Sequence, residues 1–241
     1  MESMKRADLI VTPSNAMADM IRETCPTVKR KNFQTLYHGY NEQSLKSTPD
    51  ERYIKQFAFD GYKLLYPTHA APHKGFEILF KMLFYLKKQL KSFALFVPIC
   101  DEDWPEGIKK YKAMIANLKL QDNVVFLGRV PQEQMGYLYQ NCDLMVYPSL
   151  CESFGFSMVE ALGFGLPIVA AGTPINKEMC QEAALYYDPL DPKEGAQAIQ
   201  NFFSQGLGEK LRVAGRARYN SYDWSWENNV REFVKLFDMV V

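Results

Sequence analysis

Short apolar segments alternate with longer segments of helical periodicity along most of this chain of 241 residues. The clearest periodic segment is 76–91, where apolar residues share one broad face and the lysines face water. Short apolar runs bounded by Pro, Gly or Asn are instead typical of buried parallel strands. We predict core strands at residues 63–67, 93–99, 123–127, 144–147, 168–171 and 184–187. We predict helices at residues 76–91, 106–118, 132–141, 156–162, 176–182, 194–205 and 208–219.

The repeated order of strand and helix predicts an α/β fold with a doubly wound, Rossmann-like parallel sheet, because parallel strands need crossovers between them. Before this repeat, segment 7–14 predicts a short strand that ends at Pro13. Ser14 then offers an N-cap for a helix at residues 16–23. Residues 41–61 are polar at first and predict a loop and a short helix.

Composition narrows the class of protein. The chain is 47% hydrophobic and 23% charged with no net charge, so no strong field favours nucleic acid or an anionic membrane. Its five cysteines are odd in number and lack Cys-x-x-Cys spacing, which indicates reduced thiols in a cytoplasmic protein rather than a disulfide framework or a zinc site. No apolar run is long enough to predict a transmembrane helix, and the N-terminus lacks a signal-peptide pattern.

The stretch at residues 143–173 predicts a strand, a loop, a helix and a second strand, which together form a βαβ unit. The helix expected at 156–162 has Ser153 or Ser157 available as its N-cap. Gly163 and Gly165 are expected to end it. The unit therefore has a glycine-containing loop at a helix N-terminus, and such a loop favours an anion because its N–H groups are unpaired.

Two carboxylates bracket this loop, with seven residues between them. Glu152 precedes the helix and Glu160 lies inside it. A carboxylate repels phosphate, but it accepts short hydrogen bonds from sugar hydroxyls. A phosphate at the helix start, with hydroxyl acceptors on either side, indicates a nucleotide-sugar.

The run Glu152-Ser-Phe-Gly-Phe-Ser-Met-Val-Glu160-Ala-Leu-Gly-Phe-Gly-Leu-Pro-Ile-Val-Ala resembles the Glu-x7-Glu donor-site motif of retaining glycosyltransferases with the two-lobed GT-B fold. Within that class it is most similar to the large fourth family, the glycosyl transferases group 1. The two glutamates alone would be a weak signal, but Pro148-Ser149 before them and Gly165-Leu-Pro-Ile-Val after them also match. The alternative interpretation is a surface-charged helix in an ordinary α/β protein.

A second anion-binding element is predicted at residues 68–75, between a strand and a helix. A lysine at the end of a parallel strand, in front of a helix, is well placed for a phosphate. The resemblance implies that Lys74 contacts the donor diphosphate. The Gly-Arg pair of many family members is replaced by Thr68-His69 here, so His69 is either a phosphate contact or a loop histidine bonded to backbone. For His73 we expect the second role.

Two further matches concern the nucleobase and the last helix. The resemblance implies that the turn at Arg129-Val130 packs beside the nucleobase and offers backbone groups to it. The Arg129 side chain either reaches the phosphates or is solvated. Trp224-Ser-Trp226-Glu227 resembles a late family signature at the start of the last helix, where we expect Trp226 to be a structural anchor.

The resemblance also implies a domain organisation. Residues 1–40 are expected to be the last strand and helix of an otherwise missing N-terminal lobe plus a linker, and 41–225 the nucleotide-sugar-binding lobe. Residues 226–241 are expected to form a helix that crosses back toward the missing lobe. The chain is then either a piece of a longer protein or a naturally short one. Alternatively, residues 1–40 simply add a strand and a helix to one compact domain.

The implied function is that of a hexosyltransferase that moves a sugar from a UDP-, GDP- or ADP-sugar to an acceptor hydroxyl with retention of configuration. Such an enzyme would act in polysaccharide or glycan biosynthesis, on a glycan, a lipid-linked or a small-molecule acceptor held through the missing lobe. It would lie in the cytoplasm, or at the periphery of a membrane in a longer protein. No Asp-x-Asp motif stands at a strand end, and the family needs no divalent ion, so we expect neither metal nor cofactor.

The predicted site has two groups of residues. Glu152 and Lys74 are the expected catalytic residues, because one holds the transferred sugar and the other the leaving diphosphate. The expected substrate-binding residues are Glu160, Gly155, Phe156, Arg129, Val130, His69 and Ser157. One alternative is a nucleotide-sugar-binding module without turnover, because the acceptor lobe is absent. Another is an enzyme similar to sugar phosphorylases or epimerases, although the cofactor-lysine signature of a phosphorylase is not found.

Overall fold

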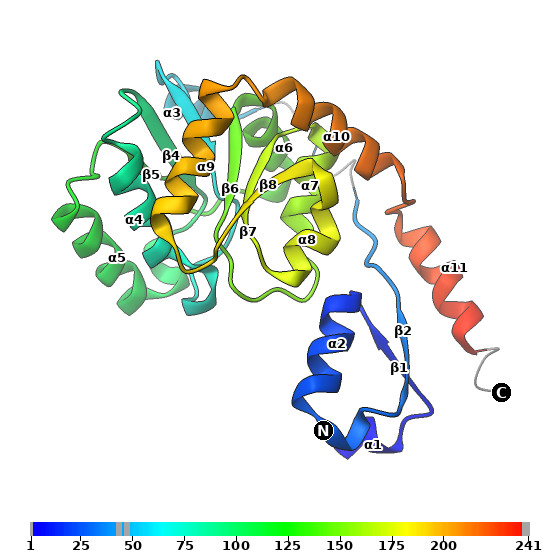
Figure 1. The fold of residues 1–241 in the computed structure, drawn as a ribbon. Helices are drawn as coiled ribbons and strands as arrows, with labels where there is room; N and C mark the ends of the chain where they lie inside the picture. Colours follow the sequence, from blue (N-terminus) through cyan, green and yellow to red (C-terminus); the bar gives the residue numbers. More distant parts are fainter. Residues whose placement is uncertain (1, 42–44, 46–48, 238–241) are drawn as a thin grey trace.

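The computed structural model describes residues 2–41, 45 and 49–237. Within these residues, six strands form one parallel sheet in the order β5-β4-β3-β6-β7-β8, with helices on both faces (Figure 1). The strands are β3 (Tyr62–Leu65), β4 (Phe93–Val97), β5 (Val124–Phe126), β6 (Leu144–Tyr147), β7 (Ile168–Ala171) and β8 (Ala184–Tyr187). This arrangement confirms the predicted doubly wound, Rossmann-like α/β fold.

The helices separate into two groups on the sheet. One group has α4 packed against α5 and α9, and the other has α7 packed against α6, α8 and α10. The bounds are α3 (Glu51–Gln56), α4 (Phe76–Leu86), α5 (Pro105–Asn117), α6 (Gln132–Asn141), α7 (Phe156–Phe164), α8 (Pro174–Cys180), α9 (Pro192–Ser204) and α10 (Gly208–Asn220). Because helices cover both faces, every residue of β4, β6 and β7 is buried, which explains their continuous apolar sequences.

The order in which strands are added to the sheet changes direction between β3 and β6. From β3 the chain proceeds outward through β4 to β5, and it then returns through α6 to place β6 on the other side of β3. Leu64 accordingly pairs with Leu95 on one side and with Leu144 on the other. Ligands of open α/β sheets bind beside the carboxyl ends of the strands at such a reversal, so the ends of β3 and β6 locate the candidate site.

The N-terminal residues form a small separate unit. It contains α1 (Glu2–Arg6), β1 (Leu9–Thr12), α2 (Asn15–Thr24), the 3-10 turn η1 (Pro26–Val28) and β2 (Asn32–Thr35). In the described part of the chain, β1 and β2 form a two-stranded parallel sheet with its own small core. Figure 1 shows this unit below the large sheet, with the last helix α11 (Trp226–Phe237) running beside it.

A carboxylate from the large sheet domain holds this unit in place. Glu178 of α8 accepts hydrogen bonds from the backbone N–H groups of Asn15 and Ala16, at 2.8 and 2.7 Å, and one from the Tyr37 hydroxyl at 3.0 Å. It therefore neutralises the positive N-terminal end of α2. The Ser14 hydroxyl, which caps α2 as predicted, also donates to the Ser153 carbonyl at 2.8 Å. The unit thus contacts the loop that contains Glu152.

Most element bounds agree with the sequence predictions within a few residues, and three details differ. Helix α4 ends at Leu86 instead of residue 91, because the chain must turn back to enter β4. Helix α7 begins after Gly155 without a side-chain cap among the described residues, so the prediction of Ser153 or Ser157 as its cap was wrong. Gly163 lies inside α7, and the helix ends at Gly165 in the left-handed conformation.

The tryptophan expected as an anchor is the wrong one of the pair. Trp226 is 46% exposed, whereas Trp224 is 3% exposed and donates from Nε1 to the Tyr219 carbonyl at 2.8 Å. Part of the loop predicted before α3 falls on 42–44 and 46–48, outside the described residues.

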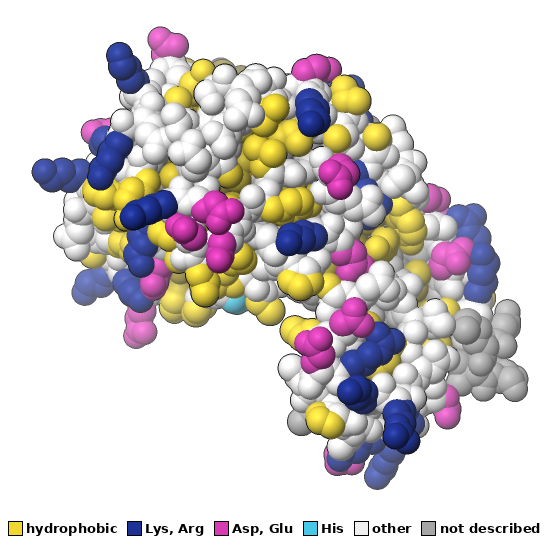
Figure 2. Space-filling model, viewed as in Figure 1, with side chains coloured by type: hydrophobic (Ala, Val, Ile, Leu, Met, Phe, Trp, Pro, Cys, Tyr) yellow, Lys and Arg dark blue, Asp and Glu magenta, His cyan; other side chains and the backbone are white. Residues whose placement is uncertain are grey.

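The surface view agrees with the balanced composition. Figure 2 shows acidic and basic side chains interspersed over both parts of the molecule, without a large patch of one sign on the visible face. None of the helices in the described ranges is both long enough and apolar enough to span a membrane.

Candidate functional site

Two helices begin at the carboxyl ends of the adjacent strands β3 and β6. The residue before α4 is Gly75 and the residue before α7 is Gly155, both in the left-handed conformation with φ of 69° and 91°. A Cβ on Gly75 would lie 2.2 Å from the Pro148 carbonyl oxygen, so the two loops pack backbone against backbone. Among the described residues neither helix has a side-chain cap. Their N–H groups are therefore available to an anion, as the sequence predicted.

Lys74 and Glu152 form an ion pair between these two loops. The Lys74 Nζ lies 2.6 Å from Glu152 Oε1, and the two side chains are only 8% and 11% exposed. The backbone of Lys74 is fixed as well, because its carbonyl accepts a hydrogen bond from the Tyr66 hydroxyl at 2.7 Å. The structure thus brings together the two residues predicted as catalytic, and Lys74 is not a solvated surface lysine.

Glu152 has a second partner that the sequence analysis missed. Its Oε1 also accepts a hydrogen bond from the Tyr147 hydroxyl at 2.9 Å, and Tyr147 is the last residue of β6. Burial, with the nearby Glu152 charge, raises the pKa of Tyr147 well above its ordinary value, so the phenol stays protonated and donates. In the described part of the chain, Glu152 Oε2 has no hydrogen-bond partner. One oxygen of the carboxylate is therefore occupied and the other is available.

Glu160 lies one turn into α7 and has a similar partner. Its Oε2 accepts a hydrogen bond from the Tyr139 hydroxyl of α6 at 2.5 Å. Burial raises the pKa of Glu160, and the hydrogen bond from Tyr139 opposes this effect only in part. The carboxylate is thus a partly desolvated acceptor with its Oε1 unoccupied by any described residue.

A cavity of about 530 Å³ opens beside the ends of β3 and β6. Five of the predicted substrate-binding residues line it, namely His69, Arg129, Val130, Ser157 and Glu160. The other lining residues, which were not predicted as site residues, are Pro67, Thr68, Pro98, Asp103, Gln132, Met135 and Tyr139. The volume is in the range of small-molecule and cofactor sites.

Arg129 lies at the rim of this cavity. Its Nη2 is 3.1 Å from Asp103 Oδ1, and its side chain is 76% exposed. Burial tends to raise the pKa of Asp103, but hydrogen bonds from Cys100 and Arg129 outweigh burial and hold that pKa below its ordinary value. The arginine is therefore tied to a neighbouring carboxylate at the rim, which favours the solvated alternative over a phosphate contact. Asp103 was missed because a lone run of acidic residues in a loop carries no ligand pattern.

The two loop histidines have different surroundings. His69 lines the cavity, and burial together with the charge of Lys74 lowers its pKa, so its imidazole is neutral at pH 7. His73 is exposed, and its carbonyl accepts a hydrogen bond from the Leu150 N–H at 3.0 Å. His73 thus joins the two loops through its backbone.

Phe156, a predicted substrate-binding residue, has its ring in contact with the linker. Its ring stacks on His38 of the linker, with centroids 5.4 Å apart and planes at 10°. Phe156 can therefore contribute its backbone N–H to an anion while its ring contacts the linker. His38 was not predicted to contact Phe156, because the two residues lie far apart in the chain.

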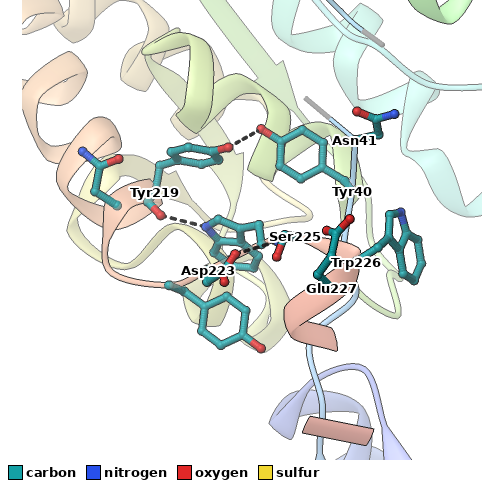
Figure 3. A pocket seen from close by; sticks show the side chains of 10 residues that line it. Tyr40, Asn41, Tyr219, Asp223, Ser225, Trp226 and Glu227 are labelled. Carbon is teal, nitrogen blue, oxygen red and sulfur yellow. Dashed lines mark hydrogen bonds between the residues drawn. The ribbon is translucent and has the colours of Figure 1, made fainter. Parts of the chain in front are cut away.

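A second cavity, of about 660 Å³, lies where the linker meets the end of α10 and the start of α11 (Figure 3). Tyr40 and Tyr219 join through their hydroxyls at 2.7 Å on one side of it, and Trp224 donates to the Tyr219 carbonyl. None of the predicted site residues lines this cavity among the residues described. It is therefore a joint between the linker and the last helix, apart from the candidate site.

The described ranges contain no group of three or more His, Cys, Asp or Glu side chains that could hold a metal ion.

Comparison with known proteins gives a family match. Residues 48–221 match the family described as glycosyl transferases group 1. The chain is 26% identical to the O-antigen chain mannosyltransferase RfbU of Salmonella typhimurium over 233 residues, which cover 96% of this chain and 60% of that protein. The chain therefore spans about three fifths of the length of this relative.

Solved structures share the fold. A sucrose-phosphate synthase from Thermosynechococcus elongatus is similar with a TM-score of 0.84 at 22% identity, covering 98% of this chain and 59% of that one. Anabaena Alr3699/HepE, solved in complex with UDP-glucose, is similar with a TM-score of 0.83 at 18% identity, covering 99% and 66%. At these identities the likeness shows the fold alone.

Proposed function

We propose that this chain, which belongs to the family of glycosyl transferases group 1, supplies the donor site of a glycosyltransferase. The enzyme would move a hexose from a nucleotide-sugar to an acceptor hydroxyl with retention of configuration. One observation carries the proposal: Lys74 and Glu152 meet between two uncapped helix starts, next to a cavity that Glu160 lines. In such a donor, Lys74 and the helix starts would match the diphosphate, Glu152 the sugar and Glu160 the ribose.

The proposed pose follows from the geometry. The ribose hydroxyls would bond to Glu160, and the base would lie toward Val130 and Pro98 at the other end of the cavity. The diphosphate would lie between the starts of α4 and α7, where Lys74 has donors left after its bond to Glu152. A related fold has been solved with UDP-glucose, which supports a donor of this class.

The proposed reaction breaks the bond between the anomeric carbon and the diphosphate while the acceptor oxygen forms a new bond to that carbon on the same face, and the acceptor proton passes to the leaving diphosphate. Negative charge grows on the leaving diphosphate through an oxocarbenium-like state. Lys74 and the N–H groups at Gly155 and Phe156 would stabilise this charge, and such prearranged electrostatics usually makes the largest contribution to catalysis. Glu152 and Glu160 would act as hydrogen-bond acceptors, rather than as the acid and nucleophile of a glycosidase.

Few cations are available for the diphosphate in this site. His69 stands where many family members have arginine, and its lowered pKa leaves it uncharged at pH 7. Arg129 is paired with Asp103 at the rim. The diphosphate charge would therefore rest on Lys74 and the two helix starts, without metal or other cofactor.

The rest of the proposal concerns what lies beyond this site. We propose that the acceptor is a glycan, a lipid-linked or a small molecule, held by a lobe that precedes residues 1–40, and that the enzyme works in polysaccharide or glycan biosynthesis. The similarity to an O-antigen mannosyltransferase supports this class of pathway. Its place would be the cytoplasm or the cytoplasmic side of a membrane. If that lobe is absent from the natural protein, the chain would instead bind nucleotide-sugars without turnover.

A thermal-shift panel tests the proposal. UDP-, GDP- and ADP-sugars are compared with the corresponding nucleosides and with free hexoses. At least one nucleotide-sugar should raise the unfolding temperature well above the values measured with its nucleoside and with the free hexose. Absence of any shift with all three classes of donor would contradict the donor-site assignment. Sugar transfer assayed with this chain alone and with a longer form then separates an enzyme from a binding module.

A further inference from the structure

We infer that Tyr147 and Tyr139 are positioning residues of the donor site, each of which fixes one glutamate carboxylate so that a single oxygen faces the ligand. The inference rests on the proposed function, because it assigns Glu152 to the transferred sugar and Glu160 to the ribose. Neither tyrosine belongs to the Glu-x7-Glu pattern, and they come from different elements, the end of β6 and the last turn of α6.

The two pairs have the same construction. Tyr147 and Tyr139 are each 2% exposed, and each hydroxyl donates to one oxygen of a glutamate, at 2.9 Å and 2.5 Å. Buried phenols need a hydrogen-bond partner, and most find it in the backbone or in another neutral group. Here both are directed at the two carboxylates that bracket the anion loop.

The hydrogen bonds leave a defined oxygen for the ligand. The terminal torsion of a glutamate side chain is broad and roughly two-fold, so an unbound carboxylate can turn. The bond to Tyr147, with that to Lys74, fixes Oε1 of Glu152 and leaves Oε2 available. The bond to Tyr139 fixes Oε2 of Glu160 and leaves Oε1 available. Each glutamate therefore presents one acceptor of known direction, which lowers the cost of ordering it when a hydroxyl binds.

A second aromatic ring extends the arrangement to the lysine. The rings of Tyr66 and Tyr147 meet edge to face, with centroids 5.7 Å apart and planes at 89°. Tyr66 donates to the backbone carbonyl of Lys74, while Tyr147 donates to the side chain of Glu152. One aromatic pair in the core thus holds both halves of the ion pair, so the position of the sugar acceptor is tied to that of the phosphate ligand.

Binding to matched variants tests the inference. Tyr147→Phe and Tyr139→Phe remove only a hydroxyl, and affinities are measured by calorimetry for UDP, GDP, UDP-glucose and GDP-mannose. Tyr147→Phe should weaken the preferred nucleotide-sugar about fivefold and change the nucleoside diphosphate less than about twofold, as expected for one hydrogen bond. Tyr139→Phe should weaken both ligands by a similar factor. Tyr147→Phe made in a Glu152→Gln background should cause little further loss.

Tyr187→Phe is the matched control. Tyr187 ends β8 of the same sheet and is 2% exposed, and its hydroxyl has no partner among the described residues. Its variant removes a buried phenol hydroxyl without touching either glutamate, so all affinities should stay unchanged. Unfolding temperatures of the three variants are measured first.

Three results would overturn the inference. One is that Tyr147→Phe weakens the binding of nucleotide-sugar and nucleoside diphosphate equally, or weakens neither, while Glu152→Gln weakens the nucleotide-sugar alone. Another is a loss for Tyr147→Phe that simply adds to the loss for Glu152→Gln. The third is an unfolding temperature for Tyr147→Phe far below that of Tyr187→Phe, which would show that the hydroxyl mainly holds the fold. If instead neither Glu152→Gln nor Glu160→Gln alters any affinity, the proposed function itself fails.

Discussion

The Nζ of Lys74 lies 2.6 Å from Oε1 of Glu152, and both side chains are almost completely withdrawn from solvent. A buried pair of this kind is costly to break from one side, because the remaining charge loses its partner without regaining water. Lys74→Met or Glu152→Gln alone should therefore lower the free energy of unfolding. The loss should be about 3–5 kcal/mol for Glu152→Gln, which leaves the more buried charge of Lys74 without its partner.

The double variant Lys74→Met/Glu152→Gln should be more stable than the Lys74→Met single, because it leaves no unpaired charge. Urea denaturation followed by circular dichroism measures all four members of this cycle. Strictly additive losses would show that the pair contributes no coupling energy. The cycle also supplies folded backgrounds for binding experiments.

Lys74 should act on the phosphates and not on the nucleoside. In the Glu152→Gln background, Lys74→Met should weaken binding of UDP or GDP by about 1.5–3 kcal/mol, the usual size of a charge-assisted hydrogen bond. Binding of uridine or guanosine should hardly change, because neither ligand reaches the starts of α4 and α7. Calorimetry of diphosphate and nucleoside on both proteins gives the comparison. Equal losses for the two ligands would mean that Lys74 does not contact phosphate.

A nucleoside diphosphate should bind without a divalent ion. Two uncapped helix starts and Lys74 are available for the anion, and the described residues contain no metal-ligand cluster. Titration in EDTA should therefore give the same affinity as titration in magnesium, within about twofold of experimental scatter. Binding that appears only when magnesium is added would contradict this expectation.

The sequence alone predicted the parts of the site that depend on local pattern. Strand ends and helix starts follow from short runs of local pattern. Glu152, Glu160 and Lys74 stand out through the longer motifs around them and the resemblance of those motifs to a known family. The tyrosines could not be found in this way, because Tyr147 looks like any apolar residue of a buried strand. Its role appears only when β6 and the loop after it fold so that its hydroxyl reaches the carboxylate.

Errors in the sequence predictions have the same physical origin. Ser153 or Ser157 was expected as the cap of α7, but among the described residues no side chain caps this helix. The Ser153 carbonyl accepts a hydrogen bond from Ser14, on a segment that no local pattern connects to it. Trp224 and Trp226 both look like anchors, and only the packing of the linker decides which one is buried. Contacts between distant segments were therefore the part that sequence reasoning could not supply.

Nucleotide binding should depend on the ionisation of Glu160. Burial raises the pKa of Glu160 in the folded protein above that of the unfolded chain, so ionisation is disfavoured by folding. Its cost to stability is thus present at neutral pH and disappears as pH falls through the raised pKa. Over the same interval the carboxylate is protonated, and nucleoside diphosphate binding should weaken.

The pH dependence has two controls. In Glu160→Gln, which cannot ionise, this weakening at low pH should be absent, although overall affinity is lower. His69 also lines the cavity and has a lowered pKa, so His69→Gln is measured to separate its titration from that of Glu160. Calorimetry between about pH 4 and 8 covers both groups. A profile unchanged by Glu160→Gln would show that this carboxylate does not bind the nucleotide.

Substitutions of the two glutamates should have different effects on ligand affinity. Ribose is present in every nucleotide, so Glu160→Gln should weaken a nucleoside diphosphate and its sugar conjugate alike. The hexose is present only in the donor, so Glu152→Gln should spare the diphosphate and weaken the conjugate. The loss of one carboxylate acceptor for a bound hydroxyl should cost about 1–3 kcal/mol in each case.

The effect on catalysis separates the residues further. Contacts to the sugar can strengthen as its ring flattens toward the transition state, so in a form that turns over, Glu152→Gln should lower kcat more than it raises KM. Glu160→Gln should act mainly on KM, because the ribose does not change during the reaction. Loss of diphosphate affinity in Glu152→Gln, with retention in Glu160→Gln, would reverse the two roles. No change in either variant would refute the donor site as a whole.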